Sequence, residues 1–194
     1  MREDTVRTFV AVLLPDRVRA GLAAVSAELR GQIRGLAWVR AENLHITLRF
    51  LGAIEPERLA RVRESMAAAA ATLAPFTMSL GGLGGFPSGR APRVLWAGVT
   101  AGAEGLESLY TVLEAALVAR GIPGESRAFH PHVTLARARN LRGADGLATV
   151  LGAGPAFGEA RVETLHLMRS ELGPRGARYS ALAEALLSDP SGAG

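Results

Sequence analysis

Hydrophobic residues along the chain follow two periods, which together predict a mixture of strands and helices. Short apolar runs with β-branched or aromatic members, as at 8–14, are typical of buried strands. Apolar residues three or four positions apart, as in Val18, Leu22, Val25 and Leu29, indicate a helix with one buried face. Strands are expected at 8–14, 44–51, 76–83, 93–99, 131–137, 161–169 and 177–182, and helices at 15–34, 55–71, 106–120 and, shorter, 141–151.

Hairpins and helices without a regular strand–helix–strand alternation predict an α+β fold. No linker rich in Pro or Ser divides the chain, so residues 1–187 are expected to form one domain. Within it, 183–187 extend the last strand or form a helical turn, and 188–194 are expected to be a disordered tail. The first residues are acidic, and no apolar run there is long enough for a signal peptide or a membrane span. We therefore expect a cytoplasmic protein.

Composition narrows the chemistry that the chain can perform. Among 194 residues there are 22 Arg, no Lys, no Cys and four His, with a net charge of +4. These counts exclude disulfides, thiolate nucleophiles, cysteine-ligated metals and lysine Schiff bases, so acid–base work at neutral pH falls first on histidine. The arginine-only balance reflects either a GC-rich genome or an affinity for phosphate, and a net charge of +4 does not by itself indicate nucleic-acid binding.

Two short segments share the pattern His-x-Thr-Leu. One is His-Ile-Thr-Leu at 45–48, and the other is His-Val-Thr-Leu at 132–135, 87 residues further on. Residues two apart in a strand point to the same face. Each predicted strand therefore presents one imidazole beside one hydroxyl, His45 with Thr47 and His132 with Thr134, while the residue between them faces the core.

Two imidazoles on opposite sides of a phosphate suit in-line displacement at phosphorus. One neutral histidine takes a proton from the attacking oxygen, and a protonated one gives a proton to the leaving oxygen. The threonine hydroxyls can donate to the non-bridging oxygens, and no metal is required. Three alternatives stay open: two merely structural polar strand faces, a non-catalytic RNA- or nucleotide-binding module, and a metal-dependent phosphoesterase with His45, His130 and His132 as ligands. The metal hypothesis leaves the repeated threonine unexplained.

The paired motifs and longer strings around them resemble the RNA 2′,3′-cyclic phosphodiesterases, also called the 2′-5′ RNA ligase family, of the two-histidine phosphoesterase superfamily. The resemblance runs over almost the whole chain. Its segments are 7–14 (RTFVAVLL), 38–52 (WVRAENLHITLRFLG), 84–99 (GGFPSGRAPRVLWAGV), 129–137 (FHPHVTLAR) and 165–182.

The resemblance implies two pseudo-symmetric lobes, each an antiparallel sheet with helices, around a central cleft. It implies hydrolysis of an RNA-terminal 2′,3′-cyclic phosphate to a 2′-phosphate without a cofactor, and reversible 2′-5′ ligation without ATP. By analogy, His45 is the acid that protonates O3′ and His132 is the base that activates water, although the sequence leaves the opposite polarity open. The expected partners are RNA ends or nucleotides with a cyclic phosphate. The protein is expected to be a monomer with no membrane and no obligate protein partner.

Two arginines compete for the role of phosphate ligand. Arg137 matches an arginine of the family, but strict alternation puts it on the face opposite His132. Arg49 is four residues after His45, so an ideal strand places both on the same face. This geometry favours Arg49 as the phosphate ligand. The resemblance ranks Arg137 first.

Two other side chains near the motifs are of interest. His130 shares the parity of His132 and is a candidate for the rim of the site. Phe50 has core-facing parity, so core packing is expected of it, with stacking on a base as the alternative.

Overall fold

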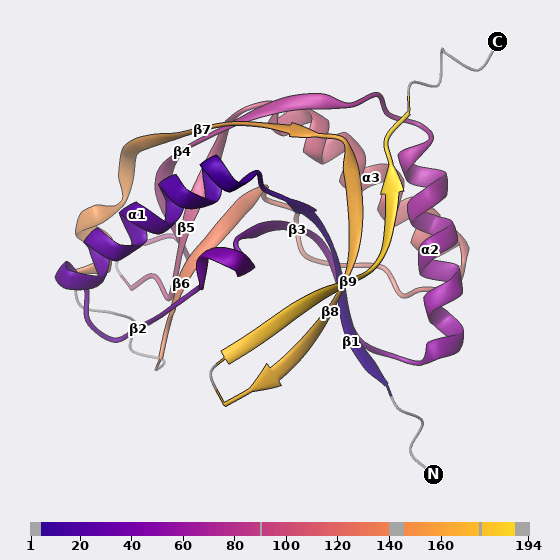
Figure 1. The fold of residues 1–194 in the computed structure, drawn as a ribbon, viewed down its shortest axis with the longest axis horizontal. Coiled ribbons are helices and arrows are strands. Elements are labelled where there is room, and N and C mark those ends of the chain that lie inside the picture. The colour runs from indigo at the N-terminus through magenta and orange to yellow at the C-terminus, as the bar shows by residue number, and fades with distance from the viewer. Residues whose placement is uncertain (1–4, 90, 140–145, 175, 189–194) are drawn as a thin grey trace.

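The computed structural model describes residues 5–89, 91–139, 146–174 and 176–188. In these ranges, nine strands form one antiparallel sheet in the order β7-β4-β5-β6-β3-β1-β8-β9, and the short β2 pairs with β6 (Figure 1). The strands are β1 (Val6–Leu13), β2 (Leu36–Trp38), β3 (His45–Ile54), β4 (Phe76–Phe86), β5 (Val94–Ala101), β6 (His132–Ala138), β7 (Gly152–Val162), β8 (Thr164–Gly173) and β9 (Gly176–Leu186). The helices are α1 (Asp16–Gln32), α2 (Pro56–Ala70) and α3 (Ala103–Ala119), with 3-10 turns η1 (Ala41–Asn43) and η2 (Leu147–Val150).

The sheet consists of two halves of four strands each, which meet at β3 and β6. The order outward from the junction is β6-β5-β4-β7 on one side and β3-β1-β8-β9 on the other. The expected α+β fold with two related antiparallel halves is confirmed, and the strands of both halves join into one continuous curled sheet (Figure 1).

The helices connect the two halves. α1 leaves β1 but packs on β7 in the other half, where the side chain of Arg17 donates to the carbonyl of Glu159 at 3.1 Å. α2 and α3 pack against each other, and α2 also packs on β8 and β9. α1 therefore packs on the half to which its preceding strand does not belong, whereas α2 follows β3 and packs on strands of the same half.

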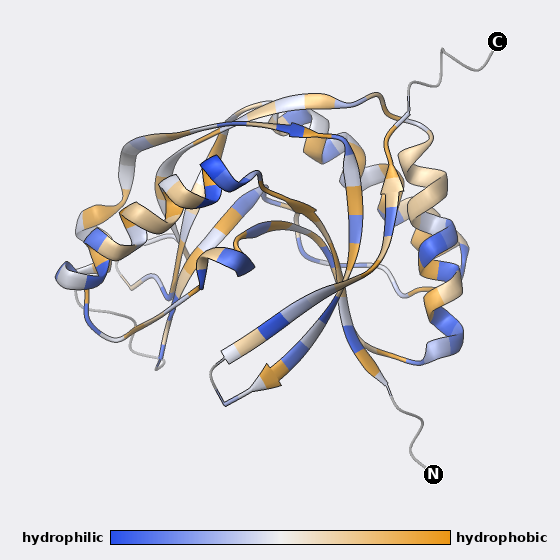
Figure 2. Cartoon of the chain, viewed as in Figure 1, coloured by the Kyte–Doolittle hydropathy of each residue, from blue (hydrophilic) through white to orange (hydrophobic). Residues whose placement is uncertain are grey.

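The core lies between the helices and one face of the sheet. Each helix presents a narrow apolar stripe to the sheet and polar residues to solvent, visible as alternating hydrophobic and hydrophilic bands in Figure 2. The largest fully buried side chains are Leu22, Leu44, Ile46, Met66, Met78, Leu80, Leu95, Leu106, Leu109, Leu113, Leu117 and Leu135. None of the helices in the described ranges is long and apolar enough to cross a membrane.

Most of the predicted elements are confirmed, but two strands were not predicted. β7 carries Gly152, Gly154, Pro155 and Gly158, which disfavour strands, and it is tolerated because it lies at the edge of the sheet and pairs only with β4. The predicted strand 161–169 is wrong as one element, since β7 ends at Val162 and β8 begins after it. The other missed strand is β2.

The expectations near the C-terminal part of the chain have mixed outcomes. Residues 183–186 extend β9, as one of the two alternatives had it. In 141–151, the structure shows only the turn η2, and 141–145 lie outside the described residues. Of the expected tail, Ser188 donates its backbone N–H to the carbonyl of Ala70 at 3.0 Å, and 189–194 lie outside the described residues.

Candidate active site

The two His-x-Thr motifs lie side by side at the junction of the two halves. Their middle residues, Ile46 of β3 and Val133 of β6, are antiparallel partners and are fully buried. Continuing this register by one residue in each direction puts His45 opposite Thr134 and Thr47 opposite His132 on the other face of the sheet. We call this face, which carries both histidines and both threonines, the motif face.

The two imidazoles are oriented in the same way. Nδ1 of His45 lies 2.7 Å from the carbonyl oxygen of Asn43, and Nδ1 of His132 lies 2.6 Å from that of His130. Because a carbonyl only accepts, Nδ1 carries the hydrogen in both rings, and Nε2 is the basic nitrogen when the ring is neutral. Nε2 of His45 accepts a hydrogen bond from the hydroxyl of Thr47 at 2.9 Å.

Both imidazoles have pKa values below the ordinary value. Burial is the main cause that lowers the pKa of His45, with the charges of His132 and Arg137 adding to it, while the bond to Asn43 opposes the shift. Burial also dominates the lowered pKa of His132, followed by the opposing bond to His130 and the charge of Arg137. Because each positive charge disfavours the next, protonation of both imidazoles at once is disfavoured.

Aromatic rings hold His45 in place. The ring of Phe9 stacks on the imidazole at 4.8 Å between centroids, and Tyr179 meets its edge at 5.4 Å. Phe9 and Tyr179 also contact each other at 4.9 Å. These contacts restrict the rotation of His45 and remove water from its ring.

His132 has a similar surrounding in the other half of the sheet. Phe86 lies edge-on to its imidazole at 5.1 Å, and Trp96 lies at 6.1 Å. His130 is exposed, and its ring lies 6.0 Å from that of Phe86, which also contacts His132. Its contact with a substrate stays a prediction.

A β-bulge changes which side chains of β3 reach the motif face. Ala11 of β1 pairs with Thr47, but the preceding Val10 pairs with Arg49, which leaves Leu48 as an extra residue without a partner. The alternation of β3 is therefore reversed after Leu48. Both Leu48 and Arg49 point toward the helices and are buried.

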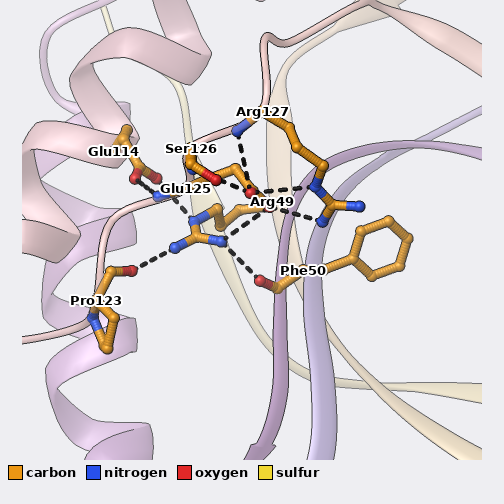
Figure 3. A network of polar contacts seen from close by, with 7 residues as sticks. All are labelled: Arg49, Phe50, Glu114, Pro123, Glu125, Ser126 and Arg127. Atoms are coloured by element: carbon orange, nitrogen blue, oxygen red, sulfur yellow. Dashed lines mark hydrogen bonds and ion pairs between the residues drawn. The ribbon is translucent and has the colours of Figure 1, made fainter.

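The parity prediction for Arg49 is wrong for this reason. Its guanidinium lies in a network on the helix side, shown in Figure 3, and is 8% exposed. Nε donates to Glu114 at 2.8 Å, and Nη1 lies 3.5 Å from Glu125. Further hydrogen bonds go to the carbonyl oxygens of Phe50 and Pro123. Arg49 therefore stabilises the connection between β3 and α3 and is not placed to bind a substrate phosphate.

Phe50 is moved in the opposite direction by the same bulge. It pairs with Phe9, the residue that stacks on His45, and its ring lies 6.1 Å from that of Phe9. Its side chain is 47% exposed. The expectation of core packing is wrong, and Phe50 instead presents a ring on the motif face.

A second bulge at the corresponding place in β6 positions Arg137. Trp96 of β5 pairs with Thr134 and the preceding Leu95 with Ala136, which leaves Leu135 as the extra residue. Arg137 thereby shares the face of His132 and Thr134, and its charge lowers the pKa values of both histidines. The conflict between the resemblance and the alternation is removed, and Arg137 remains the candidate phosphate ligand.

Asn43 and Tyr179 belong to the site, but sequence reasoning gave them no role. Asn43 is buried, and its carbonyl orients His45 while its side-chain amide donates to the carbonyl of Ala177 at 2.8 Å. The position of Asn43 two residues before a motif histidine was the available signal, since His130 occupies the same position before His132. Among the described residues, no three His, Asp or Glu side chains come together in a way that could hold a metal ion.

The fold and the paired motifs are those of a phosphoesterase. The family described as LigT-like phosphoesterase matches residues 12–96 and 98–179, which include both motifs. The chain belongs to this family, which confirms the resemblance and the expectation of an enzyme.

Several curated relatives carry one name, RNA 2′,3′-cyclic phosphodiesterase. That of Archaeoglobus fulgidus is 34% identical over 177 residues, or 91% of this chain and 98% of the relative. That of Thermus thermophilus is 39% identical over 184 residues, or 91% of this chain and 88% of the relative. That of Geobacillus stearothermophilus is 40% identical over 129 residues, and the match spans only 41% of that longer relative.

Solved structures show the same fold. A crystal structure of a protein from Thermus thermophilus has a TM-score of 0.78 and 36% identity, covering 94% of this chain and 98% of that one. Escherichia coli LigT complexed with 3′-AMP has a TM-score of 0.78 and 28% identity, covering 95% of this chain and 99% of that one.

Proposed function

We propose that this protein hydrolyses the 2′,3′-cyclic phosphate at the end of an RNA to a 2′-phosphate, without a metal ion. The observation that carries the proposal is the pair of equally oriented imidazoles on adjacent strands, each with a threonine two residues away. The names of the relatives and the nucleotide bound to Escherichia coli LigT support the same substrate class.

The reaction needs one proton acceptor and one proton donor. Neutral His132 removes a proton from water at Nε2 while the water oxygen bonds to phosphorus. The bond from phosphorus to O3′ breaks in line with this attack, and His45 gives O3′ the proton from its Nε2. The products are a 2′-phosphate and a 3′-hydroxyl. His132 then releases its proton to solvent, and His45 takes one up, which restores the starting state. A 5′-hydroxyl in place of water would form a 2′-5′ linkage by the same steps.

The neighbours of the histidines would bind the charged phosphate and the base. Thr47 and Thr134 donate hydrogen bonds to the non-bridging oxygens, whose charge rises in the transition state. Arg137 adds a guanidinium that can contact two oxygens at once. Phe50 offers an exposed ring on which the terminal base can stack. The expected partner is an RNA end or a nucleotide, bound by a monomer.

An oligoribonucleotide ending in a 2′,3′-cyclic phosphate tests the proposal. Incubated with the protein in EDTA, it should be converted to the 2′-phosphate, and His45→Ala or His132→Ala should lower the rate by about a thousandfold or more. Binding without conversion would instead support the RNA-binding module. Activity that EDTA abolishes and a divalent metal restores would support the metal-dependent phosphoesterase.

A further inference from the structure

A groove of about 590 Å³ lies beside the proposed active site and is lined by residues of η1 and of the hairpin of β8 and β9. Figure 1 shows the course of these elements. Arg40, Glu42 and Asn43 line it from η1 and the residue before it, and Arg178 and Tyr179 line it from β9. We call it the Arg40–Arg178 groove. The reaction proposed above assigns it no role.

The groove shares a wall with the motif face. Tyr179 lines the groove and also meets the edge of the His45 imidazole at 5.4 Å. Asn43 lines the groove, and its carbonyl holds Nδ1 of the same imidazole. Phe9 contacts both Phe50 and Tyr179, so aromatic rings run from the exposed Phe50 to the groove.

The charged groups in the groove favour an anion. Arg40 is fixed by a hydrogen bond of 2.9 Å from Nη2 to the carbonyl of Ala177 and by an ion pair of 3.2 Å from Nε to Glu42. Arg178 adds a second guanidinium from the facing strand, so that among the described residues lining the groove two cations outnumber one acid. Arginine is the residue that most readily contacts phosphate in a defined geometry.

The proposed reaction places the RNA chain on this side of the site. In-line attack puts the water near His132 and the terminal ribose, which carries the leaving O3′, near His45. The part of the RNA that precedes this ribose must then leave from the His45 side, where Tyr179 and the groove lie.

We infer that the Arg40–Arg178 groove binds the phosphodiester that precedes the terminal nucleotide, so that an RNA oligomer is a better substrate than a mononucleotide. The inference rests on the proposed function and deepens it. Arg40 and Arg178 contact the non-bridging oxygens of that phosphodiester, and Tyr179 separates it from the cyclic phosphate.

Two substrates that differ by one phosphodiester test the inference. Adenosine 2′,3′-cyclic phosphate has no preceding linkage, whereas the dinucleotide ApA with a 2′,3′-cyclic end has one. Arg178→Ala and Arg40→Ala should each lower kcat/KM for the dinucleotide by about 3- to 10-fold and leave the mononucleotide within about 2-fold. Arg161→Ala is the matched control, because Arg161 is an exposed arginine on β7 at the opposite edge of the sheet.

A dinucleotide with an uncharged methylphosphonate linkage identifies the contact. With the wild-type protein, kcat/KM for this uncharged dinucleotide should be lower than for the charged one by about the factor that Arg178→Ala causes. With Arg178→Ala, replacing the charged linkage by the uncharged one should lower kcat/KM little further. The inference would be overturned if the arginine variants lost kcat/KM equally on the mononucleotide and the dinucleotide, or lost it on neither. It would also be overturned if the loss were confined to ligation of a 5′-hydroxyl RNA. A wild-type protein that hydrolyses neither substrate would refute the proposed function itself.

Discussion

Arg49 and Arg137 lie on the faces of the sheet opposite to those that strict strand alternation gives them, and substituting each one tests the roles proposed for them. Arg49→Met removes a buried guanidinium but keeps much of the side-chain volume. It removes the hydrogen bonds and ion pairs that Arg49 makes with the carboxylates of Glu114 and Glu125 and with the carbonyl oxygens of Phe50 and Pro123 (Figure 3).

The expected loss of stability follows from the exposure of these groups. Removing one partner of a fully buried ion pair costs about 3–5 kcal/mol. Glu114 and Glu125 are 18% and 19% exposed, so water can replace part of what is lost. Glu125 also keeps Arg127, whose hydrogen bonds hold the pKa of that carboxyl at about 2. We therefore expect Arg49→Met to lower the free energy of unfolding by about 2–4 kcal/mol.

Urea denaturation followed by circular dichroism measures this change as a lower midpoint with an unchanged slope. Adding Glu114→Gln to Arg49→Met should recover part of the loss, because it removes a partly buried charge that has lost its cationic partner. The kcat/KM of the folded Arg49→Met protein on a cyclic phosphate should stay within about 2-fold of the wild type, since the side chain lies on the helix side of the sheet.

Arg137→Met is the matched comparison. Its side chain is exposed, so the free energy of unfolding should change by about 0.5 kcal/mol or less. Loss of a donor to the developing charge should lower kcat/KM by about 100- to 1,000-fold. The reasoning fails if Arg49→Met loses activity to this extent while its urea midpoint is unchanged.

Other predictions concern the histidines and their neighbours. The pH profile of kcat/KM should be bell-shaped with its maximum below pH 6.5, because the pKa values of His45 and His132 both lie below that ordinary value; a maximum above pH 7 would contradict these shifts. Phe50→Ala should lower kcat/KM for adenosine 2′,3′-cyclic phosphate by about 5- to 100-fold with an unchanged urea midpoint. A lower urea midpoint would instead show that Phe50 packs in the core. Asn43→Ala should lower the free energy of unfolding by about 1–2 kcal/mol in urea, because the bond to the carbonyl of Ala177 is lost.

The sequence predicted the elements and the motif pair well because both depend on short-range patterns. The two-residue period of a strand put His45 beside Thr47, and His132 beside Thr134, on one face. The same rule failed beyond these residues, since it assumes a strand without insertions. Only the partner strand shows that Leu48 and Leu135 are extra residues, and no local pattern marks them.

The role of Arg49 depends on residues far along the chain. Glu114 is 65 positions away and reaches Arg49 only because α3 packs near β3. An arginine in a buried ion pair and an arginine that binds phosphate cannot be told apart in the sequence, and only the fold distinguishes them. The missed β7 has a related cause, because pairing with β4 outweighs the low strand propensity of its glycines and proline.

The two bulges also place different side chains at equivalent positions of the motif face. Phe50 stands three residues after Thr47, and Arg137 stands three residues after Thr134, so one half of the duplicated frame offers a hydrocarbon ring where the other offers a cation. If both positions held the same residue, a cyclic ester could enter in either of two poses related by a half-turn, and each histidine would serve as the acid in one of them. In the proposed reaction, with Phe50 on one side and Arg137 on the other, one of these two poses places the base on the ring and the phosphate at the guanidinium. In the proposed reaction, this difference between equivalent positions would give the two histidines different roles.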